Sequence, residues 1–241
     1  MERTHGVGTW CAYGRDRHRP RQVRPRPAHD EAVLPTGHDH TLLVYVLDVY
    51  DPWSYAYLPS VGEVFTAAAP QVAVEVVNSG RYAGWDVADL APRAAAVAAS
   101  TDTRFGAPFV DLMTRGGTRI DAERAAAGVI GLLAAGDLSV DQVLRAVQDE
   151  LFVRGRLLQA PGVLRSVGDQ LGLDGHAIEV FADTPRAREL AAEDFAMSMD
   201  FDQAGGPLLL ASHGGRVFEF DGLGATSERL MDQFRSVMAR P

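Results

Sequence analysis

The chain contains 241 residues, 46% of them hydrophobic, and carries a formal net charge of −9. This length is sufficient for one domain with an inserted subdomain and a sizeable core, whereas no apolar run approaches the length of a membrane span. The acidic charge argues against nucleic acid or an anionic membrane as the main partner, because both are negatively charged themselves. The single cysteine, Cys11, excludes an intramolecular disulfide and a Cys–His metal cluster, and it is consistent with a reducing cytoplasm.

The first 40 residues differ from the remainder in composition. They contain seven arginines and five acidic residues, a net charge of +2, which leaves −11 for the rest of the chain. The Arg/Pro-rich run from Arg15 to Pro27 and the lack of apolar periodicity predict a disordered leader, and no apolar stretch resembles a secretory signal. Two alternatives are a nucleic-acid-binding arm formed by the arginines and a metal site at His38-Asp39-His40. We favour the leader over both, and we interpret Cys11 as a stray tail cysteine.

A strand, a turn and a helix follow this leader. Residues 42–47 form a short β-branched and aromatic run that is typical of a buried strand. Asp51-Pro52 is a favourable helix start, because the carboxylate can accept orphan N–H groups and proline at the first helical position needs no N–H. Apolar spacing predicts a helix over 52–68. A second strand over 72–77 would then lie parallel to the first through a right-handed crossover.

From about residue 86 to residue 200 the sequence predicts helices almost throughout. The expected helices cover 87–99, 121–135, 139–152, 161–171, 174–182 and 185–199. The chain then returns to two strands, 207–211 and 216–220, which should form an antiparallel hairpin, and ends in a helix over 226–239. Because the helical run stands between a β-α-β unit and the last two strands, we interpret it as an insertion into one domain, residues 41–240.

The turn between the first strand and the first helix resembles a known motif. Proteins of the DsbA type, which have a thioredoxin fold, carry Cys-Pro-Trp/Tyr-Cys at this place, where the chain has Asp51-Pro52-Trp53-Ser54. Segments 78–84, 105–109, 148–155 and 205–210 resemble further landmarks of that family, in the same order. The resemblance implies an α/β, thioredoxin-like fold with an all-helical insertion subdomain, and a cis peptide bond before Pro207.

Both cysteines of the motif are absent, and this changes its chemistry. In the family the first thiolate is stabilised by the helix N-terminus. Asp51 places a carboxylate there that cannot attack a disulfide, and Ser54 cannot complete one, so we exclude a dithiol-disulfide oxidoreductase. Two interpretations of Asp51 remain open. It is a general acid/base whose pKa is raised by desolvation and lowered by the helix terminus, or it is an N-cap that contributes about 1 kcal/mol.

The resemblance also defines a candidate site at the ends of the strands, where open α/β sheets gather ligands. The expected catalytic residues are Asp51, Ser54 and Tyr55. The expected substrate-binding residues are Trp53, Asn78, Ser79, Arg81, Gly206 and Pro207. Arg81 could hold an anionic group of the substrate, although a surface arginine and packing roles for the aromatic residues are the simpler interpretations. We expect neither a metal nor a cofactor.

The leading functional hypothesis is a non-redox enzyme, an isomerase, cyclase or lyase that tailors a small metabolite. DsbA-like proteins occur among the tailoring genes of aromatic polyketide pathways of the frenolicin type, so the resemblance implies secondary metabolism and antibiotic biosynthesis. One alternative is a catalytically inactive DsbA-like protein that binds a peptide, a partner or a second copy of itself as a homodimer. Another is a thiol-dependent isomerase or transferase, because 2-hydroxychromene-2-carboxylate isomerases and kappa-class glutathione transferases resemble the segment from Asp48 to Tyr55, with serine in place of Asp51.

Overall fold

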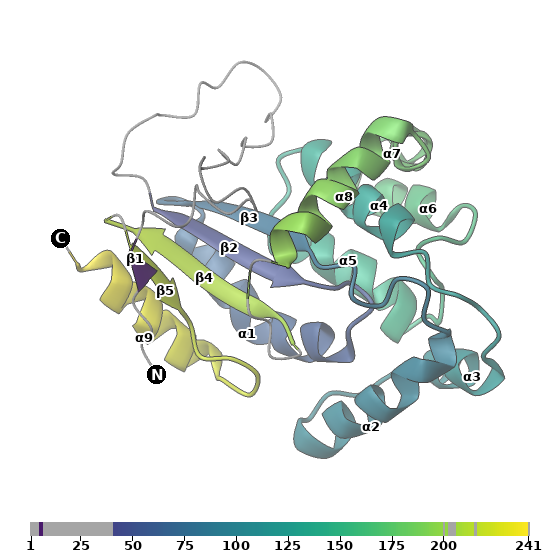
Figure 1. The fold of residues 1–241 in the computed structure, drawn as a ribbon, viewed down its shortest axis with the longest axis horizontal. Coiled ribbons are helices and arrows are strands. Elements are labelled where there is room, and N and C mark those ends of the chain that lie inside the picture. Colours follow the sequence, from purple (N-terminus) through teal and green to yellow (C-terminus); the bar gives the residue numbers. More distant parts are fainter. Residues whose placement is uncertain (1–4, 7–40, 200, 202–205, 215, 241) are drawn as a thin grey trace.

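The computed structural model describes residues 5–6, 41–199, 201, 206–214 and 216–240 (Figure 1). Of the expected leader, residues His5–Gly6 are described, and they form strand β1. The rest of the leader, with Cys11 and the segment His38-Asp39-His40, lies outside the described residues. Among the helices that are described, none is both long and apolar enough to cross a membrane.

Within the described residues, a mixed sheet of five strands forms the centre of the fold, in the order β1-β5-β4-β2-β3. Strand β2 (Leu42–Leu47) leads into helix α1 (Pro52–Ala68) and then into β3 (Ala73–Asn78), which pairs parallel with β2 as predicted. Strands β4 (Leu208–His213) and β5 (Arg216–Glu219) form the predicted antiparallel hairpin. Strand β4 also pairs antiparallel with β2, so the start of β4 reaches the edge where β2 and β3 end.

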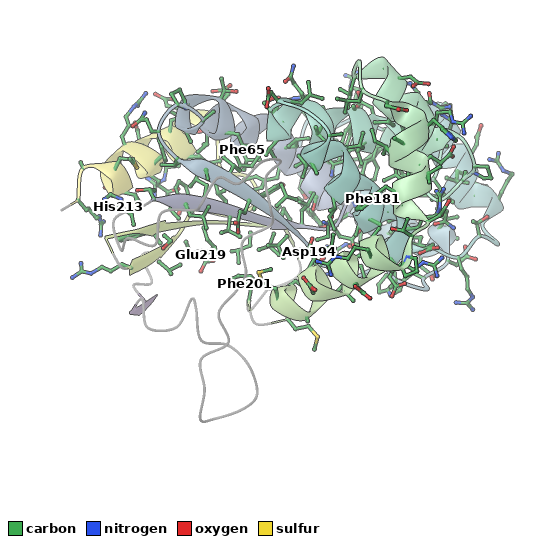
Figure 2. The ribbon with its side chains drawn as sticks, turned by 90° about the horizontal axis from the view of Figure 1, so that it is seen from above. Phe65, Phe181, Asp194, Phe201, His213 and Glu219 are labelled. Atoms are coloured by element: carbon green, nitrogen blue, oxygen red, sulfur yellow. The ribbon has the colours of Figure 1, made fainter. Side chains whose placement is uncertain are left out.

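Helices cover both faces of this sheet (Figure 1). Helix α1 and the final helix α9 (Ser227–Met238) contact each other on one face, and α8 (Pro185–Ser198) packs against β3 on the other. In Figure 2, Phe65 of α1 lies on one side of the sheet, and Asp194 of α8 and Phe201 lie on the opposite side. Side chains of a strand alternate between the two faces. The sheet is therefore buried on both sides, with Phe65 in the main core and Phe201 packed on a smaller cluster.

The predicted helical insertion is confirmed between β3 and β4. It comprises a short 3₁₀ helix η2 (Val87–Leu90) and helices α2 (Ala91–Ser100), α3 (Ala107–Arg115), α4 (Ala122–Ala134), α5 (Val140–Phe152), α6 (Val163–Gln170), α7 (Gly175–Ala182) and α8. Local chemistry explains several of the ends. Ser139 and Gln142 form a capping box at the start of α5, and Gly172 adopts a left-handed φ of 76° just after α6.

Two details differ from the sequence predictions. Helix α3 was not among the helices expected from the sequence, although residues 105–109 were assigned to the helical insertion. Pro108 lies in the first turn of α3, where a missing N–H costs nothing. No peptide bond between described residues is cis, so the cis bond expected before Pro207 is not present. The trans isomer is the ordinary low-energy form even before proline, and the extended entry into β4 accommodates it.

Candidate active site

The candidate site lies where three segments meet at one edge of the sheet. Leu47 lies beside Asn78 in the parallel pair, and Val46 lies opposite Leu208 in the antiparallel pair. Pro207 directly precedes Leu208 and therefore lies level with the end of β2. The turn after β2, the loop after β3 and the entry to β4 thus converge at the N-terminus of α1.

Asp51 caps this N-terminus, as predicted. Its backbone is extended (φ −82°, ψ 117°), and its Oδ1 atom accepts the amide N–H of Trp53 at 3.2 Å. Pro52 follows at the first helical position. The carboxylate is almost completely buried, since its side chain is 3% exposed. A buried anion requires partners that compensate for the loss of water.

Two side chains from other segments supply these partners. The hydroxyl of Tyr82, in the loop after β3, donates to Oδ1 of Asp51 at 2.9 Å. The guanidinium of Arg93, on α2, contacts the same oxygen through Nε at 3.3 Å and Nη2 at 3.2 Å. All four hydrogen bonds described for this carboxylate end on Oδ1, and none from the described residues ends on Oδ2. One oxygen is therefore fixed in place, while the other accepts no hydrogen bond within the part of the chain that the structure describes.

Burial and the neighbouring groups act in opposite directions on the pKa of Asp51. Loss of water raises this pKa, whereas the charge of Arg93, the hydroxyl of Tyr82 and the N–H of Trp53 lower it. Burial is the largest influence, so the pKa is raised above the ordinary aspartate value. A raised pKa makes the ionised carboxylate a stronger proton acceptor than an exposed aspartate.

A second buried carboxylate, Asp48, holds the surrounding loops together. Its Oδ1 accepts the amide N–H of Tyr50 at 2.9 Å, and its Oδ2 accepts the amide N–H of Tyr82 at 3.2 Å. Burial raises the pKa of Asp48 to about 6, with a smaller contribution from the charge of Asp51 and an opposing one from Arg81. By fixing the backbone of Tyr82, Asp48 determines where the Tyr82 hydroxyl meets Asp51.

The residues of the altered motif lie in different surroundings. Trp53 is half-buried next to Asp51, and its N–H belongs to the cap. Ser54 is fully buried, and its hydroxyl has no hydrogen-bond partner among the described residues. Tyr55 stacks on Phe152 with ring centroids 4.7 Å apart, and no contact between it and Asp51 is described. Ser54 and Tyr55 therefore pack into the protein, and their catalytic roles stay predictions.

The residues expected to bind substrate also have structural partners. The amide and side-chain nitrogens of Asn78 both donate to Oδ2 of Asp194 on α8, at 3.0 and 2.7 Å, so Asn78 anchors the end of β3 to that helix. Ser79 bonds to the end of β2 through its amide. Arg81 is half-buried, and its charge lowers the pKa of Asp48. Gly206 and Pro207 lie at the entry to β4, where Gly206 approaches Leu223.

Sequence reasoning did not identify three residues of this site: Asp48, Tyr82 and Arg93. Asp48 and Tyr82 lie inside the segments that resemble the family, but an acidic residue at a strand end and a tyrosine in a loop carry no specific signal. Arg93 lies 42 residues after its partner. It is the only charged residue in α2, whose sequence is otherwise rich in alanine. An isolated charge of this kind is the one feature that could have indicated its role.

Two surface hollows are described elsewhere on the molecule. One, of about 720 Å³, is lined by residues of the helical insertion that include Arg124, Arg165 and Glu179. The other, of about 290 Å³, lies between α1 and α5. Neither includes Asp51, so the ligand site expected at the ends of the strands stays a prediction. Within the described residues, no group of three or more histidine, cysteine or acidic side chains could hold a metal ion.

Comparison with solved structures identifies the fold. The chain is similar to a candidate protein disulfide isomerase from Nitrosomonas europaea, with a TM-score of 0.71 and 16% identity over 83% of this chain and 98% of that one. It is also similar to DsbM, a cytosolic disulfide reductase from Pseudomonas aeruginosa that has also been solved with GSH. The TM-score is 0.69, at 20% identity over 83% of this chain and 100% of that one. Reduced DsbA1 from Neisseria meningitidis gives a TM-score of 0.50 at 16% identity, over 88% and 86% of the two chains.

These likenesses show that the chain has the DsbA-like thioredoxin fold with its helical insertion, as the sequence predicted. The named proteins handle disulfides, whereas positions 51 and 54 of this chain hold no cysteine. No protein-family model and no curated protein sequence matches the chain.

Proposed function

We propose that the protein is a non-redox enzyme of the isomerase, cyclase or lyase type, and that Asp51 transfers a proton on a small metabolite. The observation that supports this most directly is the arrangement around the buried Asp51 carboxylate. Tyr82, Arg93 and the N–H of Trp53 all hold Oδ1, and Oδ2 is left to act. A structural N-cap needs one hydrogen bond to a helix N–H. The additional tyrosine and arginine are not needed for capping.

Each group has a separate task in this proposal. Asp51 acts as the general base through Oδ2, and its raised pKa brings it closer to the operating pH. Arg93 keeps the carboxylate ionised between turnovers and offers a cation to negative charge that develops on the substrate. Tyr82 is fully buried and acts on Asp51 rather than on the substrate. A proton moved from one position to another requires no external electron donor or acceptor.

The two rival functions are a binding protein without activity and a thiol-dependent enzyme. A binding protein would need the same fold but no proton-transfer group, and Asp51 would then serve only as a cap. A thiol-dependent enzyme is supported by the likeness to DsbM, which has been solved with GSH. Against it, an ionised Asp51 at the place of the family's thiolate would repel the thiolate of such a cofactor.

The single cysteine of the chain and the likeness to cytosolic DsbM support placing the proposed proton-transfer activity in the cytoplasm.

The substrate can be sought by untargeted metabolite profiling of a deletion strain, followed by incubation of the accumulated compound with purified protein. We expect Asp51→Asn to lower its turnover by about 10² to 10⁴, because the amide keeps the size of the side chain and cannot accept the proton. Asp232→Asn, on the exposed face of α9, is the matched control and should convert the compound like the wild type. Turnover that survives Asp51→Asn would contradict the proposal.

A further inference from the structure

The surroundings of Asp51 also indicate which kind of proton it removes, an inference that rests on the proposed function. We infer that the substrate is a ketone with an acidic C–H next to its carbonyl group, and that Arg93 receives the carbonyl oxygen as negative charge develops on it. The inference depends on three features of the site: the relative position of Asp51 and Arg93, the limited strength of the carboxylate as a base, and the tryptophan side chains nearby in the chain.

The first feature is the relative position of base and cation. Nε and Nη2 of Arg93 both contact Oδ1 of Asp51, at 3.3 and 3.2 Å, so the guanidinium lies on one side of the carboxylate rather than across both oxygens. The Arg93 side chain is 27% exposed, and that of Asp51 is 3% exposed. A molecule that approaches Oδ2 therefore meets a partly exposed cation directly beside the base. In a ketone, the proton to be removed and the carbonyl oxygen are only a few bonds apart. A base and a cation that lie side by side can therefore reach both.

The second feature is the limited strength of the base. Each pKa unit that separates a base from the C–H it deprotonates costs about 1.36 kcal/mol. A carboxylate therefore cannot remove a proton from an unactivated carbon. A carbon next to a carbonyl is different, because the electron pair moves onto oxygen, where a preorganised cation stabilises it. Arg93 supplies this cation, and the Tyr82 hydroxyl supports Asp51 from the buried side.

The chemical step is balanced without another reactant. Oδ2 of Asp51 takes the proton, the C–H electron pair becomes the carbon–carbon double bond of an enolate, and the carbonyl π pair moves onto the oxygen beside Arg93. If Asp51 returns the proton to a different carbon of a conjugated enolate, the product is an isomer. If the enolate carbon first attacks a second carbonyl of the same molecule, the proton goes to the new alkoxide and the product is a ring.

The third feature concerns the shape of the ketone. Trp85 is 41% exposed, and its ring packs edge-on against Tyr82 with centroids 5.0 Å apart. Trp53 is half-buried and lies in the first turn of α1, directly after Pro52. Flat aromatic surfaces favour a planar partner. A ketone conjugated to an aromatic ring would be held by these surfaces, and its enolate would share the same plane.

The inference can be tested without the natural substrate, by proton exchange. The purified protein is incubated in D₂O with 1-indanone or 1-tetralone, and the loss of the signal of the hydrogens next to the carbonyl is followed by proton NMR against a protein-free sample. We expect exchange with the wild type, none above background with Asp51→Asn, and at least about tenfold slower exchange with Arg93→Gln. Arg93→Lys keeps the positive charge and is the control for a folding defect caused by loss of the arginine. This variant should exchange faster than Arg93→Gln. Arg235→Gln, on exposed α9, should behave like the wild type.

The possible results separate this inference from the proposed function. Exchange that persists in Asp51→Asn would overturn both, because the base would lie elsewhere. If neither ketone exchanges with the wild type, but Asp51→Asn still abolishes conversion of the accumulated metabolite, the ketone inference is wrong and the proton-transfer function stands. Equal exchange rates in Arg93→Gln and the wild type would remove Arg93 from the step and overturn the inference as stated.

Discussion

The carboxylate of Asp48 accepts the backbone N–H of Tyr82 at 3.2 Å and so joins the end of β2 to the loop that follows β3. The same loop presents the Tyr82 hydroxyl to Asp51. Two buried carboxylates in neighbouring positions therefore share one tyrosine, which is bound through its amide by one and through its hydroxyl by the other. Any change in Asp48 is expected to affect Asp51 through this residue.

The first prediction concerns the pH dependence of stability. The pKa of Asp48 is about 6 in the folded protein, against an ordinary value of 3.8. Between these two values the folded state holds a proton that the unfolded state has released, so the free energy of unfolding falls as pH rises from about 4 to about 6.5. The contribution of Asp48 amounts to at most about 3 kcal/mol. Asp48→Asn should remove this slope. Any further loss in the free energy of unfolding caused by the amide should be the same at every pH.

Urea denaturation of both proteins at several pH values measures the effect. Carboxylates that are coupled to neither Asp48 nor Tyr82 titrate equally in the two proteins and cancel in the difference. Parallel curves for the wild type and Asp48→Asn would show that Asp48 has an ordinary pKa.

The second prediction concerns Tyr82→Phe. Removal of the hydroxyl takes away a hydrogen bond that lowers the pKa of Asp51, so this pKa should rise. The phenyl ring keeps its contact with Trp85, and stability should fall by only about 1 kcal/mol. Carbon-13 NMR titration of the aspartate side chains measures the pKa. Tyr57→Phe, whose hydroxyl donates to the backbone of Asp221, is the control and should leave Asp51 unchanged; an equal shift in both variants would contradict a specific role for Tyr82.

The fold was largely predictable from the sequence, and the site was not. Strand β2, helix α1 and the cap at Asp51 follow from short-range patterns, in which apolar spacing and a carboxylate before proline act within a few residues. The site combines Asp51 with Tyr82 and Arg93, which lie 31 and 42 residues further along the chain. Contacts over such distances depend on how the insertion folds back. No local pattern encodes them.

The catalytic roles of Ser54 and Tyr55 stay predictions, and the same reasoning explains why these two residues lie in different surroundings from Asp51. They are close to Asp51 in sequence, and the family motif drew attention to them. A helix turns by about 100° per residue, so neighbours in sequence face different surroundings. Tyr55 consequently meets Phe105 and Phe152 of the insertion, and Ser54 faces the core.

The third prediction tests the thioredoxin-type geometry of the altered motif. In a Cys11→Ser background, Asp51→Cys combined with Ser54→Cys restores the spacing of the family motif. Residues three apart across a helical turn have Cβ atoms about 5–6 Å apart, so a small adjustment permits a disulfide. We expect oxidised protein to contain no thiol that reacts with an alkylating agent under denaturing conditions, and reduced protein to contain two. Two reactive thiols after oxidation would show that the turn differs from the family's.

The fourth prediction uses two glycines of the loop after β3. Gly80 and Gly84 both have left-handed φ angles, of 60° and 76°. A Cβ atom at Gly80 would lie 2.6 Å from the ring of Phe195 on α8, whereas a Cβ at Gly84 meets nothing within 4 Å. Gly84→Ala should cost about 1 kcal/mol of conformational strain. Gly80→Ala adds a clash and should cost about 2 to 4 kcal/mol, because the ring of Phe195 has to move. Equal losses in thermal unfolding would mean that the ring of Phe195 does not pack against Gly80.

The last prediction addresses the ion pair between Arg93 and Asp51. Arg93→Gln leaves a buried carboxylate without its cation, so the pKa of Asp51 should rise further and stability at pH 8 should fall by about 2 kcal/mol. The loss should shrink as pH falls toward 5, because protonation of Asp51 removes the uncompensated charge from the folded state. Asp51→Asn in the Arg93→Gln background has no such charge, so the double variant should be more stable at pH 8 than Arg93→Gln alone.

The wild type, Asp51→Asn, Arg93→Gln and the double variant form a double-mutant cycle. Its coupling energy, expected to be about 1 to 2 kcal/mol at pH 8, isolates the ion pair from other effects of each substitution. A coupling energy near zero at pH 8, or one that does not decrease toward pH 5, would mean that Arg93 does not balance the charge of Asp51. In that case the proton-transfer proposal would lose the cation that keeps the Asp51 carboxylate ionised.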